Sequence, residues 1–366
     1  MKNLKIFNNS KVIVTGHTGF KGSWLTAWLK QLGANVMGIS LDIPTNPSHF
    51  KVSKINKNIK DVRLDIRNRK ELEKKIISFK PNFLFHLAAQ SLVGLSYSEP
   101  SLTWETNVFG TLNILESLKK LNNNCVAVLV TSDKCYFNKE IHYGYKETDI
   151  LGGKDPYSAS KASAEMLIKS YINSFFNKKF QVRIATARAG NVIGGGDWAK
   201  NRIVPDCVRS WSKGKKVQLR NPKSTRPWQH VLEAVGGYLC LAINLKFNNN
   251  IHGESFNFGP NITEEHSVTK LVKSISNYWN NISWEVIKKS RKKFYESELL
   301  RLNCNKAKKV LKWKSVLKFD ETAEMVANWY SNFYEGSKNI EHITEEQIIR
   351  YQSLAFQRGS NWAKIY

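Results

Sequence analysis

The chain has 366 residues, and 42% of them are hydrophobic, which is enough for the core of one large domain or of two domains that share an interface. Lys and Arg outnumber Asp and Glu by 56 to 30, a formal net charge of +26, so a nucleic-acid partner has to be considered. The basic residues are scattered, however, and no zinc-binding or RNA-binding pattern accompanies them. We therefore expect no nucleic-acid partner but a basic site for small molecules that carry phosphate.

The five cysteines are widely spaced, odd in number and without a Cys-x-x-Cys pair, which argues against a disulfide framework and against a metal site. The N-terminal stretch is polar and does not resemble a signal peptide, and no apolar run approaches the roughly 20 residues that span a bilayer. These patterns predict a soluble cytoplasmic protein that binds neither a metal nor a membrane.

Apolar runs alternate with helical patterns through the first half of the chain. The predicted strands cover 11–16, 35–40, 61–65, 82–89, 125–132 and 180–190, and the predicted helices cover 23–33, 68–79, 104–121 and 157–176. Strands that alternate with helices predict an α/β fold with a doubly wound parallel sheet, as in Rossmann-like proteins.

The pattern changes after about residue 190, where a glycine-rich loop leads into segments crowded with aromatic and basic residues. We predict a Rossmann-like domain over 1–190, a smaller C-terminal substrate lobe mainly over 191–340, and a helical tail over 341–366. Within the lobe, the segment 228–260 is expected to return to the sheet domain.

The segment "TGHTGFKGSW" (15–24) lies between the first strand and the first helix. Its three glycines permit a tight turn and a close approach to a pyrophosphate, which the helix N-terminus would bind through free N–H groups. We predict a dinucleotide-binding loop, although ordinary strand–helix junctions also contain glycine. The candidate cofactor contacts in this loop are Gly16, Thr18, Gly19, Phe20, Lys21 and Gly22.

The ends of the next strands supply further candidate cofactor contacts. Ser40 or Asp42 would bind the adenosine ribose, and the absence of an arginine directly after them favours NAD over NADP. Asp65 and Ile66 could line the adenine, although a surface aspartate at a strand end is the alternative. Small residues after the fourth strand could admit a flat cofactor or serve helix–sheet packing. The candidates from this edge and the next helix are Leu87, Ala88, Ala89, Gln90 and Asn107.

Two short motifs carry candidate proton-transfer groups. "TSDKCY" (131–136) places a hydroxyl, a carboxylate and an amine at the end of the fifth strand, where a salt-bridged loop is the alternative interpretation. "YSASK" (157–161) spaces Tyr157 and Lys161 four residues apart, which puts both on one face of a helix. The reference pKa of a phenol is about 10, so Tyr157 needs nearby positive charge to act as a base.

Together these strings resemble the extended short-chain dehydrogenase/reductase family of nucleotide-sugar epimerases and dehydratases, over about residues 10–335. The resemblance is carried by "VTGHTGFKGSWL", "FHLAAQSLV", "TSDKCY", "DPYSASK", "ARAGNVIGGGDW" and "RPWQHVLE", and within the family it is strongest to CDP-glucose 4,6-dehydratases. It implies a bound NAD, a homodimer or higher homo-oligomer, and conversion of CDP-glucose to its 4-keto-6-deoxy product, a step of deoxysugar and lipopolysaccharide biosynthesis. A 4-epimerase, a dehydratase for another nucleotide-sugar, or an RNA-associated binding protein on the same fold are the alternatives.

The same resemblance assigns roles to five residues. Tyr157 would take the C4 hydroxyl proton, Lys161 would hold Tyr157 and the nicotinamide ribose, and Ser132 would hydrogen-bond the C4 oxygen. Asp133 would protonate the leaving C6 hydroxyl. Lys134, which stands where related dTDP-sugar dehydratases have a glutamate, would remove the C5 proton. An epimerase does not need this acid and base, so the motif favours a dehydratase.

Arginine and aromatic residues of the second half are candidate substrate contacts, because guanidinium groups bind phosphate oxygens through paired donors and aromatic rings can stack on a base. Ordinary surface or core roles are the alternative for each. Gly94 departs from the family pattern, which commonly has a basic residue there. The candidate substrate contacts are Asn191, Trp198, Arg202, Arg220, Arg226, Trp228, Tyr295 and Arg301.

Overall fold

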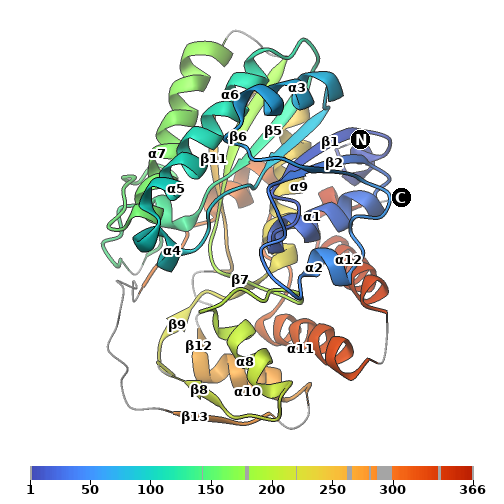
Figure 1. The fold of residues 1–366 in the computed structure, drawn as a ribbon, viewed down its shortest axis with the longest axis vertical. Coiled ribbons are helices and arrows are strands. Elements are labelled where there is room, and N and C mark those ends of the chain that lie inside the picture. Colours follow the sequence, from blue (N-terminus) through green and yellow to red (C-terminus); the bar gives the residue numbers. More distant parts are fainter. Residues whose placement is uncertain are drawn as a thin grey trace.

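Seven parallel strands form the central sheet, in the order β11-β6-β5-β4-β1-β2-β3 (Figure 1). The strands are β1 (Lys11–Thr15), β2 (Asn35–Ser40), β3 (Lys60–Arg63), β4 (Phe83–His86), β5 (Cys125–Val130), β6 (Val182–Ala189) and β11 (Ser255–Phe258). The order of the chain reverses between β1 and β4, which is where doubly wound sheets bind ligands, at the carboxyl ends of the strands. The predicted doubly wound parallel sheet is confirmed.

The computed structural model describes residues 2–141, 143–177, 181–219, 221–261, 266–279, 282–286, 299–336 and 339–364. Within these ranges no helix is both long and apolar enough to cross a bilayer. The same ranges contain no group of three or more His, Cys, Asp or Glu side chains that could hold a metal ion.

Side chains along β1 point alternately to the two faces of the sheet, and the apolar core is divided into two layers accordingly. Val12 and Val14 pack on one side of the sheet with α1 (Phe20–Gln31) and α9 (Val231–Phe247), whereas Ile13 packs on the other side. The second side is covered by α3 (Arg69–Phe79), α6 (Gly110–Lys119) and α7 (Pro156–Tyr171). Helix α9 is buried along almost its whole length because it packs on β5 and β6, beside α1, and is contacted by C-terminal segments of the chain.

The helices that carry the motifs differ in detail from the predicted ranges. The helix expected over 104–121 consists of α5 (Pro100–Trp104), a π-helical turn (Glu105–Phe109) and α6. Helix α7 begins directly after Asp155, whose side chain accepts a hydrogen bond of 3.0 Å from the Ser158 N–H and caps the helix. This cap places Tyr157 in the first turn of α7 and Lys161 one turn later.

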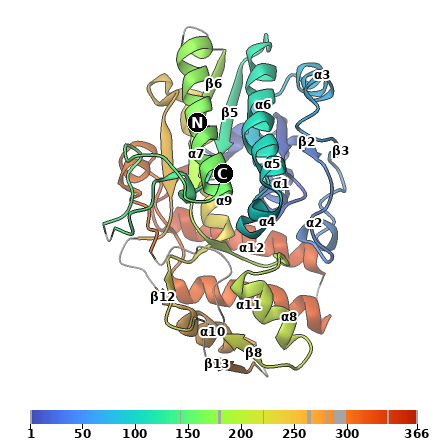
Figure 2. The same ribbon diagram turned by 60° about the vertical axis from the view of Figure 1, so that its left-hand side comes forward.

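A smaller lobe begins directly after β6 and lies below the sheet in Figure 1 and in the turned view of Figure 2. Its helices are α8 (Ile203–Trp211), α10 (Val268–Ser276) and α11 (Phe319–Glu335). Its short strands pair as β7 (Val192–Ile193) with β10 (Gln229–His230), β8 (Val217–Leu219) with β13 (Trp284–Val286), and β9 (Thr225–Arg226) with β12 (His266–Ser267). The chain leaves this lobe for α9 and β11, which belong to the sheet layers.

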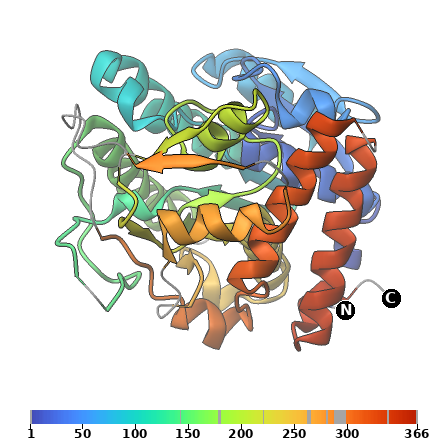
Figure 3. The same cartoon turned by 90° about the horizontal axis from the view of Figure 1, so that it is seen from below.

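The C-terminal helix α12 (Ile340–Gln357) packs against α11 and α1, and α11 and α12 lie side by side in Figure 3. A buried carboxylate fastens this region to α9. Glu233 accepts backbone N–H groups from Val316 at 2.8 Å and Leu317 at 2.6 Å, and the hydroxyl of Tyr351 at 2.9 Å. Burial raises the pKa of the Glu233 carboxyl to about 7.

Glu233→Gln should remove a pH dependence of stability. The ordinary pKa of a glutamic acid side chain is 4.5, and the folded protein raises it, so folding takes up a proton and stability falls as the pH rises from about 4.5 to 7. Glutamine can accept the same N–H groups without ionising. The free energy of unfolding of the variant minus that of the wild type should therefore increase across this window, by an amount on the order of 3 kcal/mol. Denaturant unfolding at several pH values measures the difference, and parallel curves would contradict the prediction.

Candidate active site

The glycine-rich loop after β1 is packed too closely for side chains at two positions. Gly16 has φ +76°, and a Cβ there would lie 2.7 Å from the Ala88 nitrogen. A Cβ on Gly22 would lie 2.0 Å from the Gly16 carbonyl oxygen. The loop can therefore pass this close to the end of β4 and to α1 only with glycine at both positions.

Helix α1 begins at Phe20 without a capping side chain, since its N-cap is Gly19, and its first turn holds no acidic residue. The N–H groups of this first turn have no partner within the helix and favour an anion. Lys21 lies in the same turn, and burial lowers the pKa of its ammonium to about 8, while nearby Asp133 acts in the opposite direction. This end of α1 fits the pyrophosphate of a dinucleotide.

A histidine that the sequence analysis did not single out supports this loop. His17 is fully buried, and its Nδ1 and Nε2 lie 2.9 Å from the Ser40 hydroxyl and from the Asp61 carboxylate. Its ring fills the space beside Gly38 of β2. The hydroxyl of Ser40, a predicted ribose contact, is thus hydrogen-bonded to His17. The side chain of Asp42, the other candidate, is exposed at the strand end. A glycine inside β2 was the available signal that a ring packs there.

At the other strand ends, hydrogen bonds to neighbouring groups hold the predicted residues in place. The Asp65 carboxylate accepts N–H groups of Arg67 at 2.7–2.9 Å, and these hydrogen bonds lower the pKa of Asp65. The side chain of Asn107 bonds both backbone groups of Gln90, at 2.8 and 3.0 Å, and the Ser160 hydroxyl at 2.9 Å. Asn107 therefore ties the loop after β4 to α7.

Further candidate cofactor residues lie at this edge of the sheet. Leu87, Ala88 and Ala89 are half-buried at the carboxyl end of β4, and Ile66 is buried under Gly110 at the start of α6. The Thr18 hydroxyl donates to the Asp42 carbonyl at 2.5 Å and fixes the loop to the end of β2.

The proton-transfer candidates converge at the end of β5. The Ser132 hydroxyl donates to the Asp133 carboxylate at 2.9 Å and accepts the Lys134 N–H at 3.2 Å. The Lys134 ammonium lies 3.7 Å from the same carboxylate, and its side chain is 29% exposed. Ser132 lies close enough to the Tyr157 hydroxyl to lower the pKa of the phenol. A strand tip and the first turn of α7 thus bring four candidate groups together.

Burial controls the ionisation of the helix pair. It raises the pKa of Tyr157 to about 12, and this outweighs the opposing effects of the Ser132 contact and of Arg202. It also lowers the pKa of Lys161 to about 8. Arg202 thus favours the phenolate, as nearby positive charge should, but removing the phenolate from water costs more than these contacts return.

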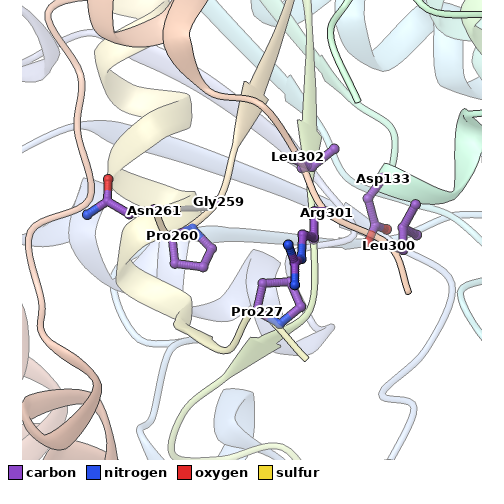
Figure 4. A pocket seen from close by; sticks show the side chains of 9 residues that line it. Asp133, Pro227, Gly259, Pro260, Asn261, Leu300, Arg301 and Leu302 are labelled. Atoms are coloured by element: carbon purple, nitrogen blue, oxygen red, sulfur yellow. The ribbon is translucent and has the colours of Figure 1, made fainter. Parts of the chain in front are cut away.

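Two small pockets adjoin this cluster. One is lined by Asp133 together with Gly190, Pro227, Gly259, Pro260, Asn261, Leu300, Arg301 and Leu302. Figure 4 shows Arg301 beside Pro227, with Asp133 near Leu300. The second pocket is lined by Lys134 and Tyr136, and Leu300 contributes to both. The acid and the amine therefore sit at the boundary between adjacent cavities, with the predicted substrate residue Arg301 in the first.

The structure places Arg202 near this cluster. Its guanidinium donates to the Asp197 carboxylate at 2.8 Å, and it is close enough to influence the pKa values of Tyr157 and Lys21. Asn191 is half-buried just before β7. Both lie in the segment that enters the lobe.

Other predicted substrate contacts have packing roles. Trp198 is 5% exposed, packs against Trp329, Tyr330 and Phe333, and donates to the Tyr334 hydroxyl at 3.1 Å, so it is a core residue and not an open stacking surface.

Trp228 packs against the same core and donates to the His266 carbonyl, and Arg226 donates to the Thr225 carbonyl. Arg220 and Tyr295 lie outside the described residues.

Residues 13–326 match the model of the GDP-mannose 4,6 dehydratase family. The chain belongs to this family. It is 42% identical, over 90% of its length and 93% of the relative's, to a CDP-glucose 4,6-dehydratase of Salmonella typhimurium. It is 27% identical to a CDP-paratose 2-epimerase of Salmonella typhi, over 74% of this chain and 85% of the relative. The resemblance to extended short-chain dehydrogenase/reductases is thereby confirmed.

Solved structures show the same fold as this GDP-mannose 4,6 dehydratase family member. A UDP-glucose 4-epimerase from Thermotoga maritima, solved with UDP-glucose, has a TM-score of 0.74 at 22% identity, covering 90% of this chain and all of its own. A dTDP-glucose 4,6-dehydratase from Bacillus anthracis, solved with NAD, has a TM-score of 0.71 at 23% identity, covering 89% and 98%. At these identities the likeness concerns the fold alone.

Gly22→Ala should destabilise the protein more than Gly19→Ala. The added Cβ at position 22 meets a backbone oxygen at 2.0 Å, whereas at position 19 the same oxygen is 3.3 Å away. We expect a loss of about 2 kcal/mol for the first variant and a clearly smaller loss for the second. Denaturant unfolding of the two variants measures this, and equal losses would show that the loop is not tightly packed.

Proposed function

We propose that this chain is a sugar-nucleotide 4,6-dehydratase that converts CDP-glucose to CDP-4-keto-6-deoxyglucose with NAD as cofactor. The observation that carries the proposal is the convergence of Ser132, Asp133, Lys134 and Tyr157 at the carboxyl edge of a dinucleotide-binding sheet. The relative that is 42% identical over 90% of the chain supports both the reaction and the nucleotide.

The cofactor fits the described residues. The glycine loop and the uncapped first turn of α1 would hold the pyrophosphate, and the half-buried residues after β4 would lie along the dinucleotide. Bound NAD supplies a hydride acceptor for C4 and a hydride donor for C6, so it ends the reaction unchanged. Its positive nicotinamide would also add the charge that Tyr157 lacks in the protein alone.

The first task of the residues is to remove a proton from the C4 hydroxyl. Tyr157 takes this proton, and Ser132, in contact with the phenol, hydrogen-bonds the C4 oxygen. Lys161, one turn later on α7, would hold the phenol and the nicotinamide ribose. Its pKa near 8 allows it to exchange a proton near neutral pH.

The second task is elimination of water across C5 and C6. Oxidation at C4 makes the C5 proton acidic, so a base can remove it while an acid protonates the departing C6 hydroxyl. Lys134 serves as the base and Asp133 as the acid once the ammonium proton has passed to the carboxylate 3.7 Å away. The amine then takes the C5 proton and the carboxyl group protonates the leaving C6 hydroxyl, which restores the ion pair. A 4-epimerase needs neither group, which favours the dehydratase over the epimerases on the same fold.

We also propose a cytoplasmic homodimer. The five cysteines are unpaired thiols, as a reducing compartment requires. Large apolar side chains are exposed on α5, on α7 and on the π-helical turns that follow these two helices, Glu105–Phe109 and Ile172–Phe176. Helices α5 and α7 pack against one another. The exposed side chains are Trp104, Phe109, Met166 and Phe175. A second copy would cover this face.

The direct test is conversion of CDP-, dTDP-, GDP- and UDP-glucose by the purified protein with added NAD. We expect a 4-keto-6-deoxy product from CDP-glucose at the highest kcat/KM. Product from another nucleotide-sugar at a higher kcat/KM would reassign the nucleotide. A C4 epimer in place of the keto sugar would overturn the dehydratase.

Two variants separate the two tasks. Tyr157→Phe should block the first proton transfer, so that CDP-glucose generates no NADH absorbance. Lys134→Met should permit this step but form no 4-keto-6-deoxy product, because C5 keeps its proton. Lys146→Met removes an exposed amine from the following loop and is the control, with activity near that of the wild type. Full activity of Lys134→Met would remove the lysine from the mechanism.

A further inference from the structure

A buried ion pair lies beneath the candidate active site. Glu165 stands one helical turn after Lys161 on α7, and Arg188 lies on β6, and both side chains are 3% exposed. The guanidinium donates to both carboxylate oxygens at 2.9 Å. Burying two charges is unfavourable unless every polar atom finds a partner, and such pairs are often kept for the geometry that they impose.

The carboxylate of this pair is fully engaged. It accepts the hydroxyl of Thr131, at the end of β5, at 2.5 Å, that of Thr186 on β6 at 3.1 Å, and that of Ser255 on β11 at 3.4 Å. Thr131 directly precedes Ser132. Glu165 therefore connects the helix of Tyr157 and Lys161 to three adjacent strands, and its contact on β5 lies next to Ser132.

The guanidinium continues the network to Tyr136, two residues after Lys134. Arg188 donates to the Tyr136 hydroxyl at 2.8 Å and lies 4.9 Å from the centre of its ring. The same hydroxyl donates to the side-chain oxygen of Asn257 on β11 at 2.8 Å. Tyr136 is 1% exposed, and burial raises its pKa well beyond the range in which it could exchange a proton.

From Asn257 the network reaches the wall of the pocket. The Asn257 amide donates to the carbonyl oxygens of Tyr145 at 2.9 Å and Asn303 at 3.2 Å. The Tyr145 N–H donates to the Arg301 carbonyl, and the Asn303 N–H returns to the Tyr145 carbonyl, both at 2.8 Å. The Tyr145 ring stacks on Tyr136 with centroids 5.1 Å apart.

We propose that Tyr136 is a positioning residue that fixes the catalytic turn 132–135 relative to the segment 301–303. The Tyr136 hydroxyl connects the ion pair of Glu165 and Arg188 to Asn257, which holds the segment 301–303. Arg301 and Leu302 line the same pocket as Asp133, so this register sets where the bound nucleotide-sugar presents its hexose to the acid and the amine. The kinetic test of this inference rests on the proposed function, whereas the hydrogen-exchange test does not.

Tyr136→Phe tests the proposal with little change in volume, and Tyr351→Phe is the matched control. Tyr351 is a buried tyrosine that donates to a buried carboxylate, Glu233, in the α9–α12 contact. Both variants should lose stability. For Tyr136→Phe we also expect a rise in KM for CDP-glucose and a fall in kcat, each by about tenfold, because a hydrogen bond from a charged group is lost. Calorimetry should show weaker binding of CDP, with NAD affinity unchanged.

Amide hydrogen exchange tests the positioning without any turnover. The Tyr145 and Asn303 N–H groups should exchange about tenfold faster in Tyr136→Phe than in the wild type and in the control. Faster exchange in a protein that does not convert CDP-glucose would support the positioning role and reject the proposed function. Wild-type exchange at both amides, or an equal loss of activity in the two tyrosine variants, would overturn the positioning role.

Discussion

The burial of charge against the end of the sheet is the constraint on which the site depends. Helix α7 carries Tyr157, Lys161 and Glu165 at successive turns, and burial raises the pKa of the first and lowers that of the second. Burial would raise the pKa of Glu165, but Arg188 and hydroxyl hydrogen bonds outweigh this and lower it. The last of the three is neutralised by an arginine and held by hydroxyl groups from neighbouring strands. The helix can therefore take only one position along the strands, and the phenol and the ammonium are placed by the same contacts. The contacts that pack the core therefore also position the candidate catalytic side chains.

The sequence alone predicted the parts of the structure that local chemistry determines. Six strands, the helices between them and the glycine loop follow from apolar runs and from glycine spacing. The motif that holds Asp133 and the one that holds Tyr157 both end up at one edge because parallel strands direct their carboxyl ends to the same side. Strand β11 was not predicted, since four residues that include Ser255 and Asn257 show no apolar run.

The remaining features depend on contacts between segments far apart in the chain. The sequence suggested that Trp198 is a stacking surface, but aromatic rings of α11 enclose it. The role of Asn107 as a link to Gln90 and Ser160 requires knowing that two helices meet beside the loop after β4. In both cases the residue type indicated an interaction, but the interacting residues are too far away in the sequence to be predicted from it.

The path of the chain between the two parts has a consequence for folding. The sheet layers are complete only after β11 has paired with β6 and after α9 and α12 have packed against α1, which comes about two hundred residues or more before them. A nascent chain that ended near residue 190 would expose the edge of β6 and the face of β5 and β6 that α9 covers. The sheet domain and the smaller lobe should therefore fold together as one cooperative unit late in synthesis, and not as two independent domains.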